Sequence, residues 1–174
     1  VLGKKNITIP LGETKITRKI KSLDIIIKTC TSVNLVTQNK MRIFEKEKSE
    51  YTFRTINSII NSIEFNKEEL KSIKLKVFII DHNSAKEDLE KIKKKLLKIH
   101  VNFEIINLDA EKFKKIKTLD KNNSIIEKNM KATMASILTS FQIAKEKCDD
   151  LIYFVEDDYI HKKESIFEML SSYE

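Results

Sequence analysis

Three acidic residues stand together near the end of this 174-residue chain. Glu156, Asp157 and Asp158 directly follow an apolar run, LIYFV, at residues 151–155. Such a run is typical of a strand buried on both faces, and in open α/β sheets ligands bind outside the carboxyl ends of these strands. Clustered carboxylates repel one another, and a hard cation such as Mg²⁺ or Mn²⁺ relieves the repulsion by taking oxygen ligands. One interpretation of the cluster is therefore a metal site.

The other interpretation of the acidic cluster is helix capping. Asp157 or Asp158 can cap a following helix, because a short side-chain oxygen accepts the unpaired N–H groups of a first turn. Residues 162–170, KKESIFEML, are typical of a helix start. The cluster by itself leaves both interpretations open.

Two further apolar runs, residues 23–28 and 75–80, predict buried strands because they lack polar alternation. The polar residues after the first run are Thr29, Cys30, Thr31 and Ser32. Those after the second run are Asp81, His82, Asn83 and Ser84. These side chains either line a ligand site or cap local structure, and Asn83 or Ser84 suits the N-cap of the next helix.

Hydrophobic periodicity predicts the remaining elements. Residues 52–65 and 129–147 carry apolar residues at helical spacing, and residues 101–106 predict a further strand. A helix between the second and third strands has a face formed by Leu89, Ile92, Leu96 and Ile99. The last long helix has a face formed by Met130, Met134, Ile137, Leu138, Phe141 and Ala144, and we expect its methionines to fill the core. This alternation predicts an α/β fold with a mostly parallel sheet and helices on both faces.

The segments outside this alternation are predicted to be peripheral. Residues 1–22 hold both glycines and the only proline, and predict an N-terminal arm or an edge hairpin, while residues 23–174 form one α/β domain. Residues 33–51 show no clean period and predict an irregular insertion over the ligand face. Because both glycines precede the first strand, the chain has neither a G-x-G-x-x-G turn nor a G-x-x-x-x-G-K-[ST] loop, which excludes the ordinary dinucleotide-binding and P-loop sites.

Composition and charge set the class of protein. With 41% hydrophobic and 34% charged residues the chain is globular. Its net charge of +7 would suit a polyanion, a phosphorylated ligand or an acidic membrane, but the lysines are spread among acids, as on solvated helix faces. Cys30 and Cys148 are far apart, and no apolar run is long enough to span a bilayer. We therefore expect a cytoplasmic protein, or one associated peripherally with the inner face of a membrane.

Four segments, taken in order, resemble motifs of the glycosyltransferases with the A-type fold, in particular the family-two group that uses nucleotide-diphosphate sugars. They are LDIIIKTCTS, VFIIDHNSAKE, EKNMKATMASILTSFQIAKEKCDD and LIYFVEDD. In that family the first strand ends in a P-T-Y-like turn, the second ends in V-D-D-x-S, a helix begins A-R-N-x, and a later strand runs into D-x-D. The resemblance covers roughly residues 23–160.

The resemblance implies a role for each matching residue. Thr29 and Cys30 would form the turn against the nucleobase, and Asp81 would lie near the base or ribose. Glu156 matches the first acid of D-x-D, near the ribose, with Asp157 in the nucleotide site beside it. The last acid, which reaches the metal in the family, matches Asp158.

The chain departs from the family pattern at three of these positions. Lys28 replaces the proline of the first turn, and His82 replaces the second acid after strand two, so its contact with the nucleobase differs from the family's. Glu156 replaces the first aspartate, which only lengthens its reach.

The resemblance further implies transfer of a sugar, expected to be uridine-linked, from a nucleotide diphosphate to an acceptor hydroxyl. Negative charge develops on the departing diphosphate, and Mn²⁺ or Mg²⁺ held by Asp158 would stabilise that charge as a Lewis acid. In the inverting family the general base lies well beyond D-x-D, and we expect it beyond Glu174. The chain, which begins with Val1, is accordingly expected to be the donor-binding part of a longer protein.

Two alternative functions remain open. A sugar nucleotidylyltransferase shares the sheet, but it needs a glycine-rich turn after its first strand, where this chain has KTCTSVN. A non-catalytic α/β interaction or nucleic-acid-binding domain is favoured by the basic charge. No interleaving of aromatic and basic residues like that of RNA-binding sheets is visible in the sequence, so we expect no nucleic-acid partner.

Overall fold

A computed structural model describes residues 18–32, 47–114 and 124–173. Its sheet has four strands, all parallel, in the order β3-β2-β1-β4. The strands are β1 (Ser22–Thr29), β2 (Lys74–Asp81), β3 (Asn102–Asn107) and β4 (Leu151–Val155). Each begins and ends within one residue of the predicted run. The prediction of a parallel α/β sheet is confirmed, and the fold is Rossmann-like.

The register of the strands brings their polar ends to one edge of the sheet. Thr29 lies opposite Asp81, and Asp81 lies opposite Asn107. On the other side of β1, Val155 is in register with Ile27, so the residues that follow these two also lie side by side. The polar residues that follow the strands in sequence therefore meet at the carboxyl edge.

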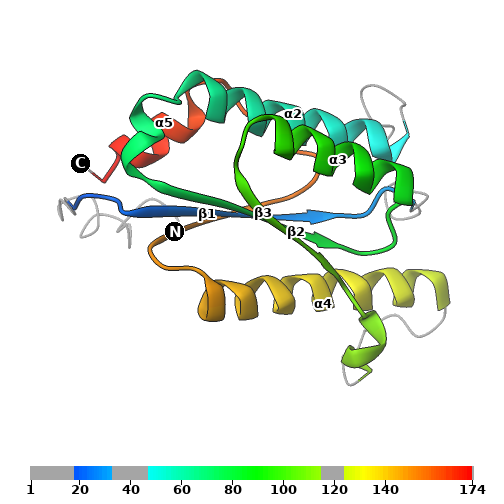
Figure 1. Cartoon of the computed structure of the whole chain (residues 1–174). Coiled ribbons are helices and arrows are strands. Elements are labelled where there is room, and N and C mark those ends of the chain that lie inside the picture. Colours follow the sequence, from blue (N-terminus) through cyan, green and yellow to red (C-terminus); the bar gives the residue numbers. More distant parts are fainter. Residues whose placement is uncertain (1–17, 33–46, 115–123, 174) are drawn as a thin grey trace, which may run out of the picture.

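Helices cover both faces of the sheet, as predicted (Figure 1). One face carries α2 (Lys48–Phe65), α3 (Lys86–Lys98) and α5 (Ser165–Ser171), and the other carries α4 (Ser124–Lys147). Two 3₁₀ turns, η1 (Glu69–Ser72) and η2 (Ala110–Phe113), precede β2 and follow β3. Because side chains alternate along a strand, Ile25 and Ile27 pack into the larger core under α2, whereas Ile26 packs into the smaller core under α4.

The buried face of α4 differs from the prediction. Met134 is 44% exposed, so the prediction that it fills the core is wrong. Leu138 and Phe141, on the same predicted apolar face, are 45% and 58% exposed. The sheet is instead faced by small residues and one isoleucine, namely Ala132, Ala135, Ser136, Ser140 and Ile143. The fully buried Phe78 supplies the bulk from the sheet side, and small residues on α4 let the helix approach it.

Two loops begin or end differently from the prediction. Residues 48–51 belong to α2, so the predicted insertion is helical at its end; residues 33–46, like residues 1–17 of the predicted arm, lie outside the described residues. The N-cap of α3 is Ala85 rather than Asn83 or Ser84. Ser84 Oγ instead accepts a hydrogen bond from the backbone N–H of Thr31 at 2.9 Å, which fixes the turns after β1 and β2 to each other.

The acids after β4 do not cap the next helix. Helix α5 begins at Ser165 and its N-cap is Glu164, so the interpretation of Asp157 or Asp158 as its cap is wrong. The connecting loop is held against α2: the N–H of His161 donates to Ser58 Oγ at 3.0 Å. This attachment fixes the chain just after the acidic cluster.

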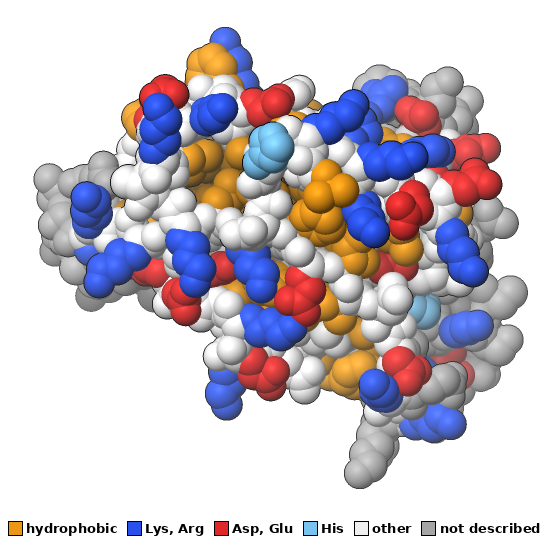
Figure 2. Space-filling model, in the orientation of Figure 1, with side chains coloured by type: hydrophobic (Ala, Val, Ile, Leu, Met, Phe, Trp, Pro, Cys, Tyr) orange, Lys and Arg blue, Asp and Glu red, His pale blue; other side chains and the backbone are white. Residues whose placement is uncertain are grey.

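Basic and acidic side chains are intermixed on the molecular face shown in Figure 2, with apolar side chains between them. Several lysines among the described residues form ion pairs with acids, for example Lys76 with Glu104 at 3.4 Å. Among the described residues, no helix combines the length and the apolar character needed to cross a membrane.

Candidate functional site

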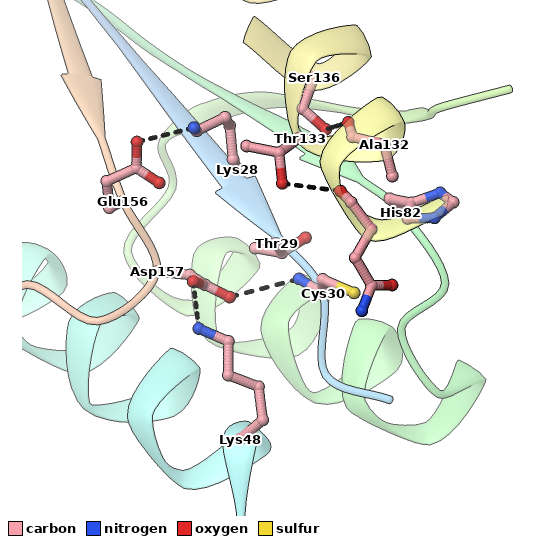
Figure 3. Close-up of a pocket in the computed structure, with 11 residues that line it drawn as sticks. Lys28, Thr29, Cys30, Lys48, His82, Ala132, Thr133, Ser136, Glu156 and Asp157 are labelled. Carbon is pink, nitrogen blue, oxygen red and sulfur yellow. Dashed lines mark hydrogen bonds and ion pairs between the residues drawn. The ribbon is translucent and has the colours of Figure 1, made fainter. Parts of the chain in front are cut away.

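A pocket of about 190 Å³ lies at the carboxyl edge of the sheet, between the ends of β1 and β4 and the first half of α4. Its floor includes Lys28, Thr29 and Cys30 at the end of β1, and Glu156 and Asp157 after β4 (Figure 3). Five of the seven residues predicted for the site line this pocket, namely Thr29, Cys30, His82, Glu156 and Asp157. The two that do not line it are Asp81 and Asp158.

The wall contributed by α4 is made of short side chains. Ala132 leaves space for the pocket, and the hydroxyls of Thr133 and Ser136 point back to their own helix. Thr133 Oγ1 donates to the carbonyl of Asn129 at 3.0 Å, and Ser136 Oγ donates to the carbonyl of Ala132 at 2.9 Å. With their protons used in this way, the two hydroxyls offer acceptor oxygens to the pocket.

Asp157 is the most constrained acid of the cluster. It is buried, and its Oδ1 forms an ion pair with Lys48 Nζ of α2. Its Oδ2 accepts from Thr52 Oγ1 at 3.0 Å and from the backbone N–H of Cys30 at 3.3 Å. This carboxylate therefore cross-links β4 to α2 and to the end of β1, and its oxygens are occupied by protein donors.

Glu156 is paired differently. Its carboxylate lies 2.7 Å from Lys28 Nζ, because Val155 and Ile27 are in register and the next residues of the two strands face each other. Both residues line the pocket, and Lys28 lies near the wall that α4 contributes (Figure 3).

Asp81 lies beneath the pocket rather than in its wall. It is 4% exposed, and its Oδ1 accepts a hydrogen bond from Thr29 Oγ1 at 2.8 Å. Its Oδ2 accepts from the backbone N–H of Ser84 at 3.3 Å. The carboxylate thereby orients Thr29 and fixes the turn after β2, where the N–H of His82 donates to the carbonyl of Thr29 at 2.9 Å.

Cys30 lines the pocket as a protonated thiol. Burial, followed by the nearby carboxylates of Asp157 and Asp81, raises the pKa of this thiol to about 11. Since the thiolate is the nucleophilic form of cysteine, Cys30 is not activated for covalent chemistry at neutral pH. Its backbone N–H, which binds Asp157, is its main polar contact with the site.

Asp158, the predicted metal ligand, is exposed. Within residues 18–32, 47–114 and 124–173, no three His, Cys, Asp or Glu side chains are arranged so that they could hold a metal ion by themselves.

Sequence reasoning missed Lys48 and the α4 wall. Lys48 falls in a segment without clear periodicity, and its pairing with Asp157 joins residues 109 positions apart, which no local pattern signals. The α4 wall had a signal, since Ala132, Ser136 and Ser140 recur at a spacing of four and mark a second, small-residue face.

None of the family models matches this chain, and the comparison with curated proteins also finds no match. The fold and the pocket together define a Rossmann-like α/β protein with lysines and carboxylates at the carboxyl edge of its sheet.

Proposed function

We propose that this chain is the donor-binding part of a glycosyltransferase with the A-type fold. It would bind a nucleotide-diphosphate sugar, best a uridine-linked one, whose sugar is transferred to an acceptor hydroxyl. The observation that carries the proposal is the position of the pocket. The turn after β1 and the acids after β4, which are the family's nucleotide-binding segments, line one cavity at the carboxyl edge of a parallel sheet.

The size of the pocket fits part of such a donor. Pockets for drug-sized ligands are typically about 300–1,000 Å³. At about 190 Å³ this one accommodates a nucleobase or a diphosphate, and the remainder of the donor would lie across the open edge of the sheet.

A divalent cation fits the exposed acids if it arrives with the donor. Mg²⁺ is usually held by one or two carboxylates together with substrate phosphates rather than by a cage made of protein alone. Asp158 is exposed and Glu156 is half exposed, so both carboxylates are accessible from solvent, whereas Asp157 is not. Asp158 would hold Mn²⁺ or Mg²⁺, which would neutralise charge on the departing diphosphate.

Calorimetric titration with uridine diphosphate, with and without Mn²⁺, tests the proposal. We expect Mn²⁺ to strengthen binding to the wild type, and Asp158→Ala to remove most of that enhancement. Asp149→Ala is the matched control, because Asp149 is an exposed aspartate at the opposite edge of the sheet, where it pairs with Lys74. Equal affinities in all experiments would leave an unassigned α/β domain.

A further inference from the structure

Two lysine–carboxylate pairs border the pocket, and they differ in accessibility. In the pair of Lys48 with Asp157 both side chains are 12% exposed. In the pair of Lys28 with Glu156 the lysine is 17% exposed and the glutamate 49%. Among the described residues that line the pocket, these two lysines are its only basic side chains apart from His82.

Lys48 is not available to a ligand. If its ammonium left Asp157, a buried carboxylate would keep only neutral donors, and breaking a buried ion pair in this way is strongly unfavourable. The pair of Lys48 and Asp157 is therefore part of the framework of the site.

Lys28 can change partner at low cost. When its ammonium moves to a ligand, the carboxylate of Glu156, which is 49% exposed, returns to water, so no buried charge is left without a partner. Lys28 also lies on the side of the pocket where α4 offers no hydroxyl protons, because Thr133 and Ser136 donate to helix carbonyls. An anionic group entering between β1 and α4 thus meets Lys28 as its charged donor (Figure 3).

We infer that Lys28 is the phosphate-binding residue of this site and selects ligands that carry a diphosphate. Its ammonium exchanges the carboxylate of Glu156 for a phosphate oxygen when the ligand enters. This inference rests on the proposed function but concerns a residue at which the chain departs from the family pattern, where proline could offer no charge. Glu156 competes with the ligand for Lys28 and is released by ligand binding.

The test compares Lys28→Met with Lys74→Met. The matched control removes a lysine that is also paired with an acid, Asp149 at 2.9 Å, but at the opposite edge of the sheet. The affinities of uridine, uridine diphosphate and inorganic pyrophosphate are measured in EDTA at fixed, low ionic strength. Because hydrogen bonds to charged groups are the stronger ones, we expect Lys28→Met to lower the affinity for uridine diphosphate and for pyrophosphate by about ten- to a hundredfold. The affinity for uridine should not change. Lys74→Met should match the wild type.

Two further variants separate ligand binding from an effect on folding. Lys28→Arg keeps the charge and should restore most of the pyrophosphate affinity, while Glu156→Gln removes the competing carboxylate and should raise it above that of the wild type. If the pair of Lys28 and Glu156 has only a structural role, Glu156→Gln will not raise the affinity for pyrophosphate. An unchanged or lower affinity in Glu156→Gln would therefore overturn the inference.

The outcomes also distinguish the inference from the proposed function. Uridine diphosphate binding equally to the wild type and to Lys28→Met would overturn the role of Lys28 and leave the proposed function standing. Pyrophosphate binding that depends on Lys28, with no added affinity for the uridine nucleotide, would support the role of Lys28 and count against a uridine-linked donor. Absence of binding by either diphosphate would overturn both.

Discussion

Replacing Asp157 by asparagine should destabilise the protein strongly. The side chain keeps its size, but it loses the charge that compensates the ammonium of Lys48, whose side chain is 12% exposed. An amide also has one acceptor oxygen where the carboxylate serves Lys48 on one side, and Thr52 Oγ1 and the Cys30 N–H on the other. Removing one partner of a buried pair costs about 3–5 kcal/mol.

That loss is large relative to the stability of a single domain. Domains are stable by about 5–15 kcal/mol, and 1 kcal/mol lowers Tm by about 2–4 °C at this chain length. Asp157→Asn should therefore lower Tm by about 6–20 °C if unfolding is two-state. Urea unfolding followed by circular dichroism measures the free energy directly.

A double-mutant cycle shows whether the pair itself is responsible. The cycle combines Asp157→Asn with Lys48→Met, and we expect the double variant to be markedly more stable than the sum of the two single losses predicts, because the second change removes the orphaned charge. Asp149→Asn, which breaks an exposed pair with Lys74, is the control and should leave stability nearly unchanged. Additive losses in the cycle, or an Asp157→Asn variant as stable as the control, would refute the assignment of Asp157 to the framework.

Two further predictions concern the orientation of α4 and the loop after β4. Phe141 is 58% exposed, whereas Ile143, two residues further and nearly opposite on the helix, is 5% exposed. We therefore expect Ile143→Ala to lower the free energy of unfolding by about 2–5 kcal/mol and Phe141→Ala to lower it much less. The reverse order in urea unfolding would show that α4 is turned the other way. Burial lowers the pKa of His161, whose Nε2 lies 2.8 Å from the hydroxyl of Tyr153 and whose Nδ1 lies 3.1 Å from Ser58 Oγ. Below pH 6.5, the ordinary pKa of histidine, the unfolded chain binds a proton at His161 that the folded protein does not. The contribution of neutral His161 to stability is therefore complete above pH 6.5 and is lost as the pH falls towards the pKa of the folded state. His161→Asn should flatten that loss when urea midpoints are compared at several pH values, and parallel curves for the two proteins would contradict it.

The sheet could be predicted from the sequence because each strand is recorded in local hydrophobicity. Runs such as residues 77–80 are apolar without alternation, and a strand covered on both faces buries every residue of such a run. The side of α4 that meets the sheet could not be read in the same way. The helix has a large-residue face through Phe141 and a small-residue face through Ser136, and the choice depends on the bulk of Phe78, which the partner strand contributes.

The candidate site, too, could be predicted only in part from the sequence. Strand ends placed Thr29, Cys30 and the acids after β4 at one edge, because parallel strands of known direction suffice for that. Which acid is buried and which is accessible depends on distant partners instead. Asp157 is fixed by α2, more than a hundred residues earlier in the chain, and no local pattern distinguishes it from its neighbours on either side.

Charge balance at the carboxyl edge connects Lys28 with the cation proposed at Asp158. Lys28 and Lys48 form ion pairs with Glu156 and Asp157, so these four side chains give the pocket little net charge. A diphosphate that takes the ammonium of Lys28 also releases the carboxylate of Glu156, and negative charge then accumulates beside the exposed Asp158. A divalent cation bound there would offset the diphosphate and both acids together, because opposite charges at close range favour one another's ionised form. Lysine exchange and cation binding are thus expected to reinforce each other rather than to act as alternative ways of holding the same phosphates.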